Sequence, residues 1–441
     1  MCIILLLFFG GAELRAQSST PAQQPAEGPA PYGTGQQEPL EYSEHIVPRN
    51  ILLFDLAEET AYDDNVLSNN ADRRSDVSFG LSPRLAFLQQ RQRTKLALDY
   101  QPTLVLYKDN SGYNAANQSV QFDGEFEASP RLELRLRDGA RYSTGLFQPV
   151  AGEALGPALG APATLNQSVY APLTREFENN TRLDLKYKTS RETSITFFGG
   201  ASERHFGHNG NLSGNLLNTD EESAGAEFID RVSRTMTLGA FYLFQNMSFG
   251  NVTRSVVHSA YLSLTKEAMH GFTFQISGGP QYARIRDRVV VSLLPGLAVT
   301  LNSIETKWHG AYQGTITHTT DKTALEISAQ RSVQDGGGLL ATVMNTDFSG
   351  GIKRELIRHW AGVFEIDAAR SQALGAVFAG SRLDSQRAGV AIEHAFTENL
   401  TGRLAYNFIR QRGTGQLPFL PDLDRNRVSF TISYQFRRKA L

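Results

Sequence analysis

The sequence has very little cysteine, since Cys2 is the only one in 441 residues. It lies before the apolar segment that opens the chain, whereas a lipid-modified cysteine follows such a segment. A mature chain that begins beyond this segment has no thiol. Disulfide scaffolds, thiolate zinc sites and cysteine nucleophiles are therefore excluded.

The sequence also lacks long apolar runs and a surplus of one charge. A membrane-spanning helix needs about 20 consecutive apolar residues, and no run after residue 12 approaches that length. The 43 basic residues are matched by 45 acidic ones, which gives a net charge of −2. We therefore expect neither a helical membrane protein nor nucleic acid as a partner, and no cofactor is expected.

What the sequence does contain is alternation, most clearly in its last segment, 427–436. Apolar side chains occupy positions 428, 430, 432, 434 and 436, with small polar ones between them. This period of two predicts a strand with one apolar and one polar face. The segment resembles the C-terminal strand of bacterial outer membrane β-barrels, and the resemblance implies that Phe436 is the residue recognised by the barrel assembly machinery.

Other segments alternate in the same way, including 94–107, 131–137 and 181–188. Alternation keeps mean hydropathy low, here −0.30, even in strands that cross a membrane. Soluble β-sandwiches alternate too, so these segments alone do not decide between barrel and sandwich.

The connections between the segments favour a barrel, because short and long joints alternate. Short turns are expected near 90–92, 129–130, 190–191, 232–234, 268–271, 319–322, 357–358 and 398–399. Longer connections are expected around 64–74, 108–116, 146–172, 207–218, 249–253, 286–304, 334–338, 373–380 and 412–424. Periplasmic turns and extracellular loops of outer membrane barrels differ in this way. We predict an all-β, antiparallel up-and-down transmembrane barrel of about 18 strands (16 to 18), in the outer membrane of a Gram-negative bacterium.

Aromatic residues near the predicted strand ends fit the same fold, because amphipathic rings favour the headgroup level of a membrane. They are Tyr187, Phe197, Phe198, Phe241, Tyr242, Phe244, Tyr261, Phe272, Phe274, Trp308, Tyr312, Trp360, Phe364, Tyr406 and Phe408. The alternative is that these rings fill the core of a large soluble β protein.

The chain divides into four parts. Residues 1–16 read as a signal peptide, with an apolar core before a short cleavage region. Residues 17–48 are rich in Pro and Gln, which predicts a disordered periplasmic leader. The barrel is expected over 49–436, followed by a short basic tail at 437–441.

Two short motifs resemble segments of a family of β-barrel porins associated with exopolysaccharide production and secretion. They are the segment Ala61–Leu67, with sequence AYDDNVL, and the segment Arg331–Leu340, with sequence RSVQDGGGLL. The first reads as an aromatic anchor followed by an Asx-type turn, and the second as a loop that needs positive φ. The resemblance implies an outer membrane barrel, with polysaccharide export proteins as partners.

If the apolar faces contact lipid, the opposite faces line the interior. The candidate pore-lining residues are Asp123, Glu125, Glu133, Arg135, Arg137, Arg182, Asp184, Lys186, Glu326, Glu365 and Asp367. Facing acidic and basic ladders would create a transverse field that orients solutes. For any single residue, simple pairing that braces the interior is the favoured interpretation.

Enzymatic and metal sites find little support in the sequence. The nine histidines are scattered, and no Ser/His pair with an orienting carboxylate can be nominated. His205 and His208 lie near Glu203 where a strand enters a loop, but this pattern is weak, and we expect no metal and no enzyme. Two functions remain: a porin-like channel for small hydrophilic solutes or saccharides, and a non-conducting outer membrane component of exopolysaccharide biosynthesis or export.

Overall fold

The computed structural model describes residues 49–144, 169–170, 174–207, 216–294, 297–415, 422–436 and 439–440. The predicted signal peptide (1–16) and leader (17–48) lie outside the described residues, as do positions 437, 438 and 441 of the predicted tail. The remaining two tail residues form a short strand, β19 (Lys439–Ala440), that pairs with the first strand.

Eighteen long strands make up nearly all of the described chain. They are β1 (Arg49–Asp63), β2 (Asp76–Gln90), β3 (Thr94–Tyr107), β4 (Ala115–Ser129), β5 (Leu132–Thr144), β6 (Arg175–Lys188), β7 (Thr193–Phe206), β8 (Thr219–Ser233), β9 (Met236–Phe249), β10 (Thr253–Glu267), β11 (Phe272–Leu294), β12 (Leu297–Thr319), β13 (Thr323–Gly336), β14 (Leu340–Ile357), β15 (Trp360–Ala373), β16 (Arg382–Ala395), β17 (Leu400–Thr414) and β18 (Leu423–Gln435). Two 3₁₀ turns, η1 (Ser111–Tyr113) and η3 (Met269–Gly271), lie in connections. No helix in the described part is long and apolar enough to cross a membrane.

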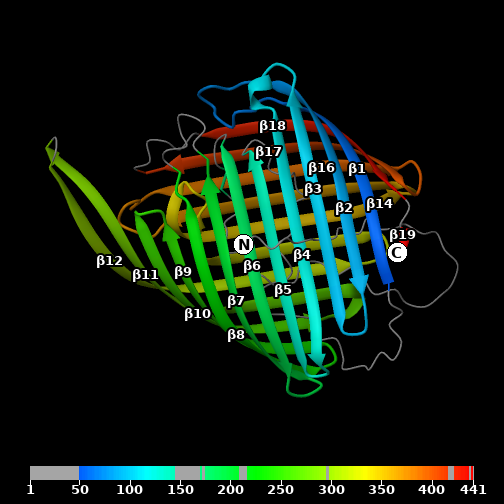
Figure 1. The fold of residues 1–441 in the computed structure, drawn as a ribbon, viewed down its shortest axis with the longest axis horizontal. Helices are drawn as coiled ribbons and strands as arrows, with labels where there is room; N and C mark the ends of the chain where they lie inside the picture. The colour runs from blue at the N-terminus through cyan, green and yellow to red at the C-terminus, as the bar shows by residue number, and fades with distance from the viewer. Residues whose placement is uncertain are drawn as a thin grey trace.

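The strands form one closed barrel. Each of the eighteen pairs antiparallel with the next, and β1 pairs with β18 from Asp55↔Gln435 to Asp63↔Arg427. Figure 1 shows the first and last strands side by side. Closure leaves no sheet edge along this seam. The prediction of an 18-stranded antiparallel barrel is confirmed.

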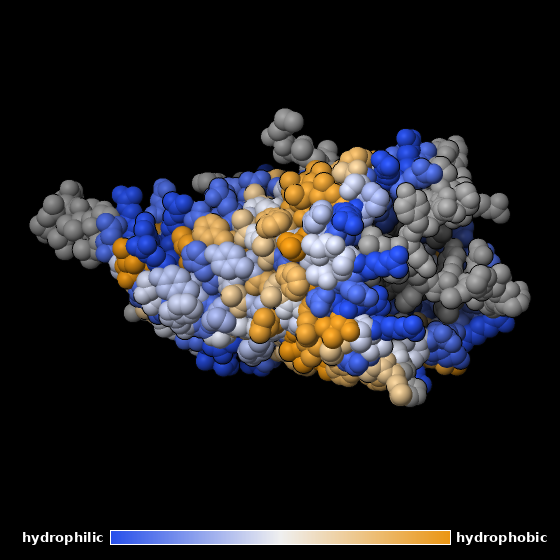
Figure 2. Space-filling view, turned by 90° about the horizontal axis from the view of Figure 1, so that it is seen from below, coloured by the Kyte–Doolittle hydropathy of each residue, from blue (hydrophilic) through white to orange (hydrophobic). Residues whose placement is uncertain are grey.

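The two faces of the wall differ as the alternation predicts. On β18, Phe430 is 45% exposed and lies on the outer face, whereas Arg427 is 8% exposed and lies on the inner face. Apolar residues gather around the middle of the face seen in Figure 2, and hydrophilic residues lie toward its two ends. Three aromatic residues expected near the membrane interfaces, Phe198, Phe241 and Tyr261, instead project into the barrel, because their registers place them opposite inner-face partners.

Short turns lie at one end of the barrel, here called the turn end, and the longer connections lie at the other, the loop end. The motif Ala61–Leu67 leaves the barrel at the loop end, where the Asn65 amide donates to Asp63 Oδ1 over 3.0 Å. This is the predicted Asx-type turn. The predicted connection at 286–304 is wrong, because β11 continues to Leu294 and β12 begins at Leu297. The hairpin of these two strands reaches past the rim at the left of Figure 1.

The wall is not uniformly paired. Strand β12 pairs with β13 only between Tyr312↔Arg331 and Thr319↔Ala324. Beyond that point β13 stays paired with β14 as far as Gly336↔Leu340. This end of the β13–β14 hairpin, residues 332–344, contacts the inner face of β9–β11. We call it the infolded hairpin.

Candidate functional site: the lumen and its infolded hairpin

All eleven candidate pore-lining residues lie on the inner face of the wall. Cross-strand pairs place Asp123 opposite Arg137, Glu125 opposite Arg135, and Arg182 opposite Arg137. Lys186 lies opposite Glu133. Glu326 and Glu365 lie on either side of Gly351, which faces both of them from β14. Their part in permeation stays a prediction.

Many of these charges bind one another. The Arg135 guanidinium binds Asp123 through two contacts, with Nε–Oδ1 at 3.0 Å and Nη2–Oδ2 at 2.5 Å. Arg137 and Arg182 both bind Asp184, at 2.5 and 2.7 Å. Hydrogen bonds between a guanidinium and a carboxylate are stronger than those between neutral groups. They brace neighbouring strands, in agreement with the simpler interpretation of these residues.

The most deeply buried ion-pair cluster was not predicted from the sequence. Arg204 on β7 binds Glu176 at 2.9 Å, Glu178 at 2.6 Å and, with Nη1, Asp335 Oδ2 at 2.9 Å. The side chains of Arg204 and Asp335 are 4% and 0% exposed. Alternation alone places Arg204 on the inner face, but it gives no sign of a partner 131 residues away. The cluster fastens the tip of the infolded hairpin to the inner face of β6 and β7.

Apolar contacts hold the body of the hairpin. Val333 and Met344 pack against Met247, Val257 and Ala283, which lie on the inner face of β9–β11. The Val333 amide also donates to Gln281 Oε1 over 2.9 Å. The hairpin and wall thus form two packed layers at this point, which narrows the interior.

Two glycines allow the tip to lie so close to its neighbours. Gly337 and Gly338 have φ of 63° and 82°, as the sequence motif predicts. A Cβ atom on Gly337 would lie 2.5 Å from the Cβ of Val169, and one on Gly338 would lie 2.3 Å from the Phe206 ring. Side chains at these positions are therefore excluded both by conformation and by space.

The end of the connection between β5 and β6 also lies inside the barrel. Tyr170 and the Gln411 side chain exchange two hydrogen bonds of 2.9 Å, and Val169 packs against Leu340 and Leu383. Burial raises the pKa of the Tyr170 hydroxyl above its usual value, so the group stays neutral. The rest of the predicted loop 146–172 lies outside the described residues.

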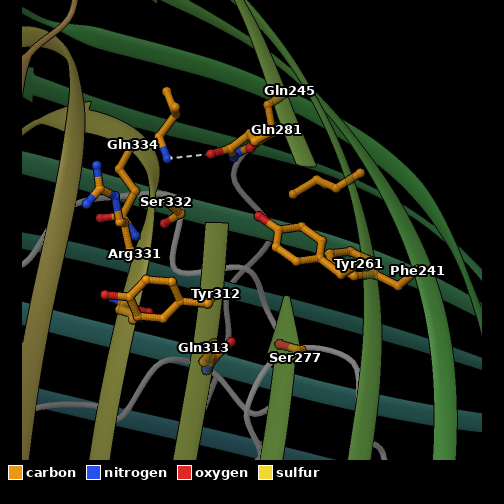
Figure 3. Close-up of a pocket in the computed structure, with 13 residues that line it drawn as sticks. Phe241, Gln245, Tyr261, Ser277, Gln281, Tyr312, Gln313, Arg331, Ser332 and Gln334 are labelled. Atoms are coloured by element: carbon orange, nitrogen blue, oxygen red, sulfur yellow. Dashed lines mark hydrogen bonds between the residues drawn. The ribbon is translucent and has the colours of Figure 1, made fainter. Parts of the chain in front are cut away.

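A pocket lies where the infolded hairpin leaves the wall (Figure 3). The space within it, together with the open solvent at its mouth, amounts to about 460 Å³. Phe241 and Tyr261 line one side as a stacked pair with ring centroids 4.9 Å apart. Five glutamines contribute amides: Gln245, Gln281, Gln313, Gln330 and Gln334. Aromatic faces and amides together can hold a ring that has both apolar and hydrogen-bonding groups.

The histidines named from the sequence lie elsewhere. The structure brings Glu203 and His205 together with Asp220, with His205 Nε2 at 3.4 Å from each carboxylate. They occupy the outer face at the loop end, away from the lumen. His208 lies outside the described residues.

A closed barrel of 18 strands, with an apolar exterior and a charged interior, is a transmembrane β-barrel of the bacterial outer membrane type. No family model matches the chain, and no curated protein matches it.

The solved structures similar to this chain include outer membrane proteins from Pseudomonas aeruginosa. OpdK in its crystal structure with vanillate has 11% identity and a TM-score of 0.43, over 88% of this chain and 99% of that chain. OpdQ has 10% identity and a TM-score of 0.44, over 88% and 97%. These identities and TM-scores are too low to support an argument about function. The assignment of the fold rests on the strand register of this chain.

Proposed function

We propose that the protein resides in the outer membrane of a Gram-negative bacterium and acts as a porin-like channel for small hydrophilic solutes or saccharides. The observation that carries this proposal is the closed 18-stranded wall, whose inner face is polar and charged. Barrels of 16 to 18 strands enclose an aqueous interior. The infolded hairpin and residues 169–170 narrow that interior at the loop end.

Single-channel recording in planar bilayers tests this function. We expect discrete conductance steps from refolded protein whose gel mobility shows the heat-modifiable, folded form. The control is the same protein heated before addition, which should give none. Folded protein that inserts and yet gives no steps would refute the channel.

The second candidate is a non-conducting component of exopolysaccharide export. It is favoured by the resemblance of the Arg331–Leu340 motif, because this motif forms the hairpin that fills part of the lumen. Silence in bilayers, combined with loss of exported polysaccharide on deletion of the gene, would support it. Polysaccharide export proteins would then be partners of the barrel.

We further propose that the barrel assembly machinery recognises Phe436. Its ring is 40% exposed on the outer face and lies 4.8 Å from the rings of Phe54 and Tyr434. An aromatic group at the seam remains accessible there before closure.

Asp335→Ala should enlarge the channel. Arg204 keeps Glu176 and Glu178 as partners in this variant, so the wall stays intact while the hairpin tip loses its ionic contact. We expect single-channel conductance to rise about twofold or more as the hairpin samples positions outside the lumen. Asp384→Ala is the matched control, because it removes a half-buried carboxylate that pairs with Arg370 and Arg382, away from the hairpin. Equal conductance in both variants would show that the hairpin does not limit flow.

A further inference from the structure

The wall has an opening at the place where β12 and β13 separate. Their last paired residues are Tyr312 and Arg331, although β12 extends a further fifteen residues, to Leu297, and β13 extends to Gly336. Beyond Arg331 the β13 chain turns inward, where Gln281 and Arg204 hold it. In the described part of the chain, no strand takes its place beside β12, although the connection after β15 reaches this edge, where Lys307 Nζ donates to the Leu374 carbonyl over 2.7 Å.

The lining of the pocket shows that this opening passes through the wall. Gln281 and Tyr261 lie on the inner face, opposite the buried Ser259 and the inner-face Phe241. Tyr312, by contrast, lies on the outer face and is 47% exposed. Side chains on opposite faces of a continuous sheet point away from each other. Tyr312 and Arg331 share a pocket with Tyr261 because the sheet is interrupted there (Figure 3).

The opening has a distinct chemical character. Its inner side presents the stacked rings of Phe241 and Tyr261, and Tyr312 adds a third ring from the outer side. Of the glutamines that line the pocket, Gln245, Gln281 and Gln334 already bond Glu221, Ser259 and Asn345, whereas Gln313 and Gln330 form no side-chain hydrogen bond within the described residues. Arg331 also lines the pocket and has no acidic partner among the described residues. Rings offer an apolar face, whereas amides bind hydroxyl groups.

We propose that this opening is a side portal that binds an amphipathic molecule in which an aromatic ring is joined to a second ring that carries hydroxyl groups. Such a molecule exchanges between the lumen and the outer surface without passing the infolded hairpin. From the proposed function, this inference takes only the assumption that the barrel lies in a membrane. Binding at the portal is measured without any conduction. The experiments can therefore tell failure of the portal from failure of the channel.

Binding in lipid nanodiscs is the first test, with p-nitrophenyl β-D-glucopyranoside as the probe and glucose as the polar comparison. We expect the probe to bind and glucose to bind at least tenfold more weakly, because glucose lacks the second ring. Tyr261→Ala should weaken probe binding about tenfold, which is about 1.4 kcal/mol. Tyr242→Ala is the matched control, because Tyr242 lies on the outer face of β9 and outside the pocket. Equal losses in both variants would contradict the site.

Nitroxide labels test whether the site crosses the wall, because their mobility can be read at lumen-facing and at lipid-facing positions. Three single-cysteine proteins are made in a Cys2→Ser background and labelled in detergent before reconstitution: Ser277→Cys on the inner side, Tyr312→Cys on the outer side, and Tyr242→Cys as the control. The probe should lower nitroxide mobility at the first two positions and leave the third unchanged. A change at position 277 alone would place the site wholly in the lumen and overturn the portal, as would the absence of any change.

Discussion

Arg204→Ala is expected to lower the free energy of unfolding by about 3–5 kcal/mol, because it leaves buried carboxylates without their shared cation. Glu176, Glu178 and Asp335 all bind this one guanidinium, and Arg141 compensates only Glu178, at 2.5 Å. Urea unfolding in lipid vesicles, followed by tryptophan fluorescence and by gel mobility, measures the change.

Two further variants make the result specific. Arg204→Lys keeps one charge but loses the planar fork, so its stability should fall between those of the wild type and Arg204→Ala. Arg370→Ala breaks a pair with Asp384 in which the arginine side chain is 59% exposed, and should cost about 0–1 kcal/mol. A loss of less than about 1 kcal/mol in Arg204→Ala would contradict the structural role of the cluster.

Phe430→Arg should destabilise the inserted barrel by about 2–4 kcal/mol, because it places a charge at the middle of the lipid-facing band. Phe430 pairs with Thr60 and Leu404 near the centre of β18 and is exposed on the outer face. Reversible urea unfolding in vesicles gives the free energy.

A substitution at a different depth in the membrane is the control for this prediction. Tyr62→Arg changes an equally exposed outer-face aromatic next to the loop end of β1. There the arginine reaches the headgroups, and the expected cost is about 0–1 kcal/mol. Equal costs at the two positions would mean that Phe430 does not lie in hydrocarbon.

Alternation and turn spacing are local properties, and they were sufficient for the fold. A period of two assigns each side chain to a face, so the inner positions of residues such as Asp123 and Arg182 follow directly from the sequence. The same rule works at the seam, where β18 meets β1 in the register that keeps Phe430 outside.

The infolded hairpin could not be predicted in this way. Its position depends on contacts such as Arg204 with Asp335 and Val333 with Gln281, which join residues far apart in the sequence. The glycines at 337 and 338 indicated a sharp turn but not its direction. The error at 286–304 has a different cause. Gly, Asn and Pro residues suggested a long connection, but β11 and β12 continue through most of this segment and extend past the rim.

The central claim is that the apolar stripe of each strand meets hydrocarbon while the polar stripe faces enclosed water. A nitroxide scan of positions 427–435 in lipid vesicles tests it most directly, through collisions with oxygen and with a water-soluble nickel chelate. We predict that even-numbered positions favour oxygen and odd-numbered ones the chelate, in strict alternation. Equal access of both reagents along the strand, or chelate access at positions 428, 430 and 432, would contradict the claim.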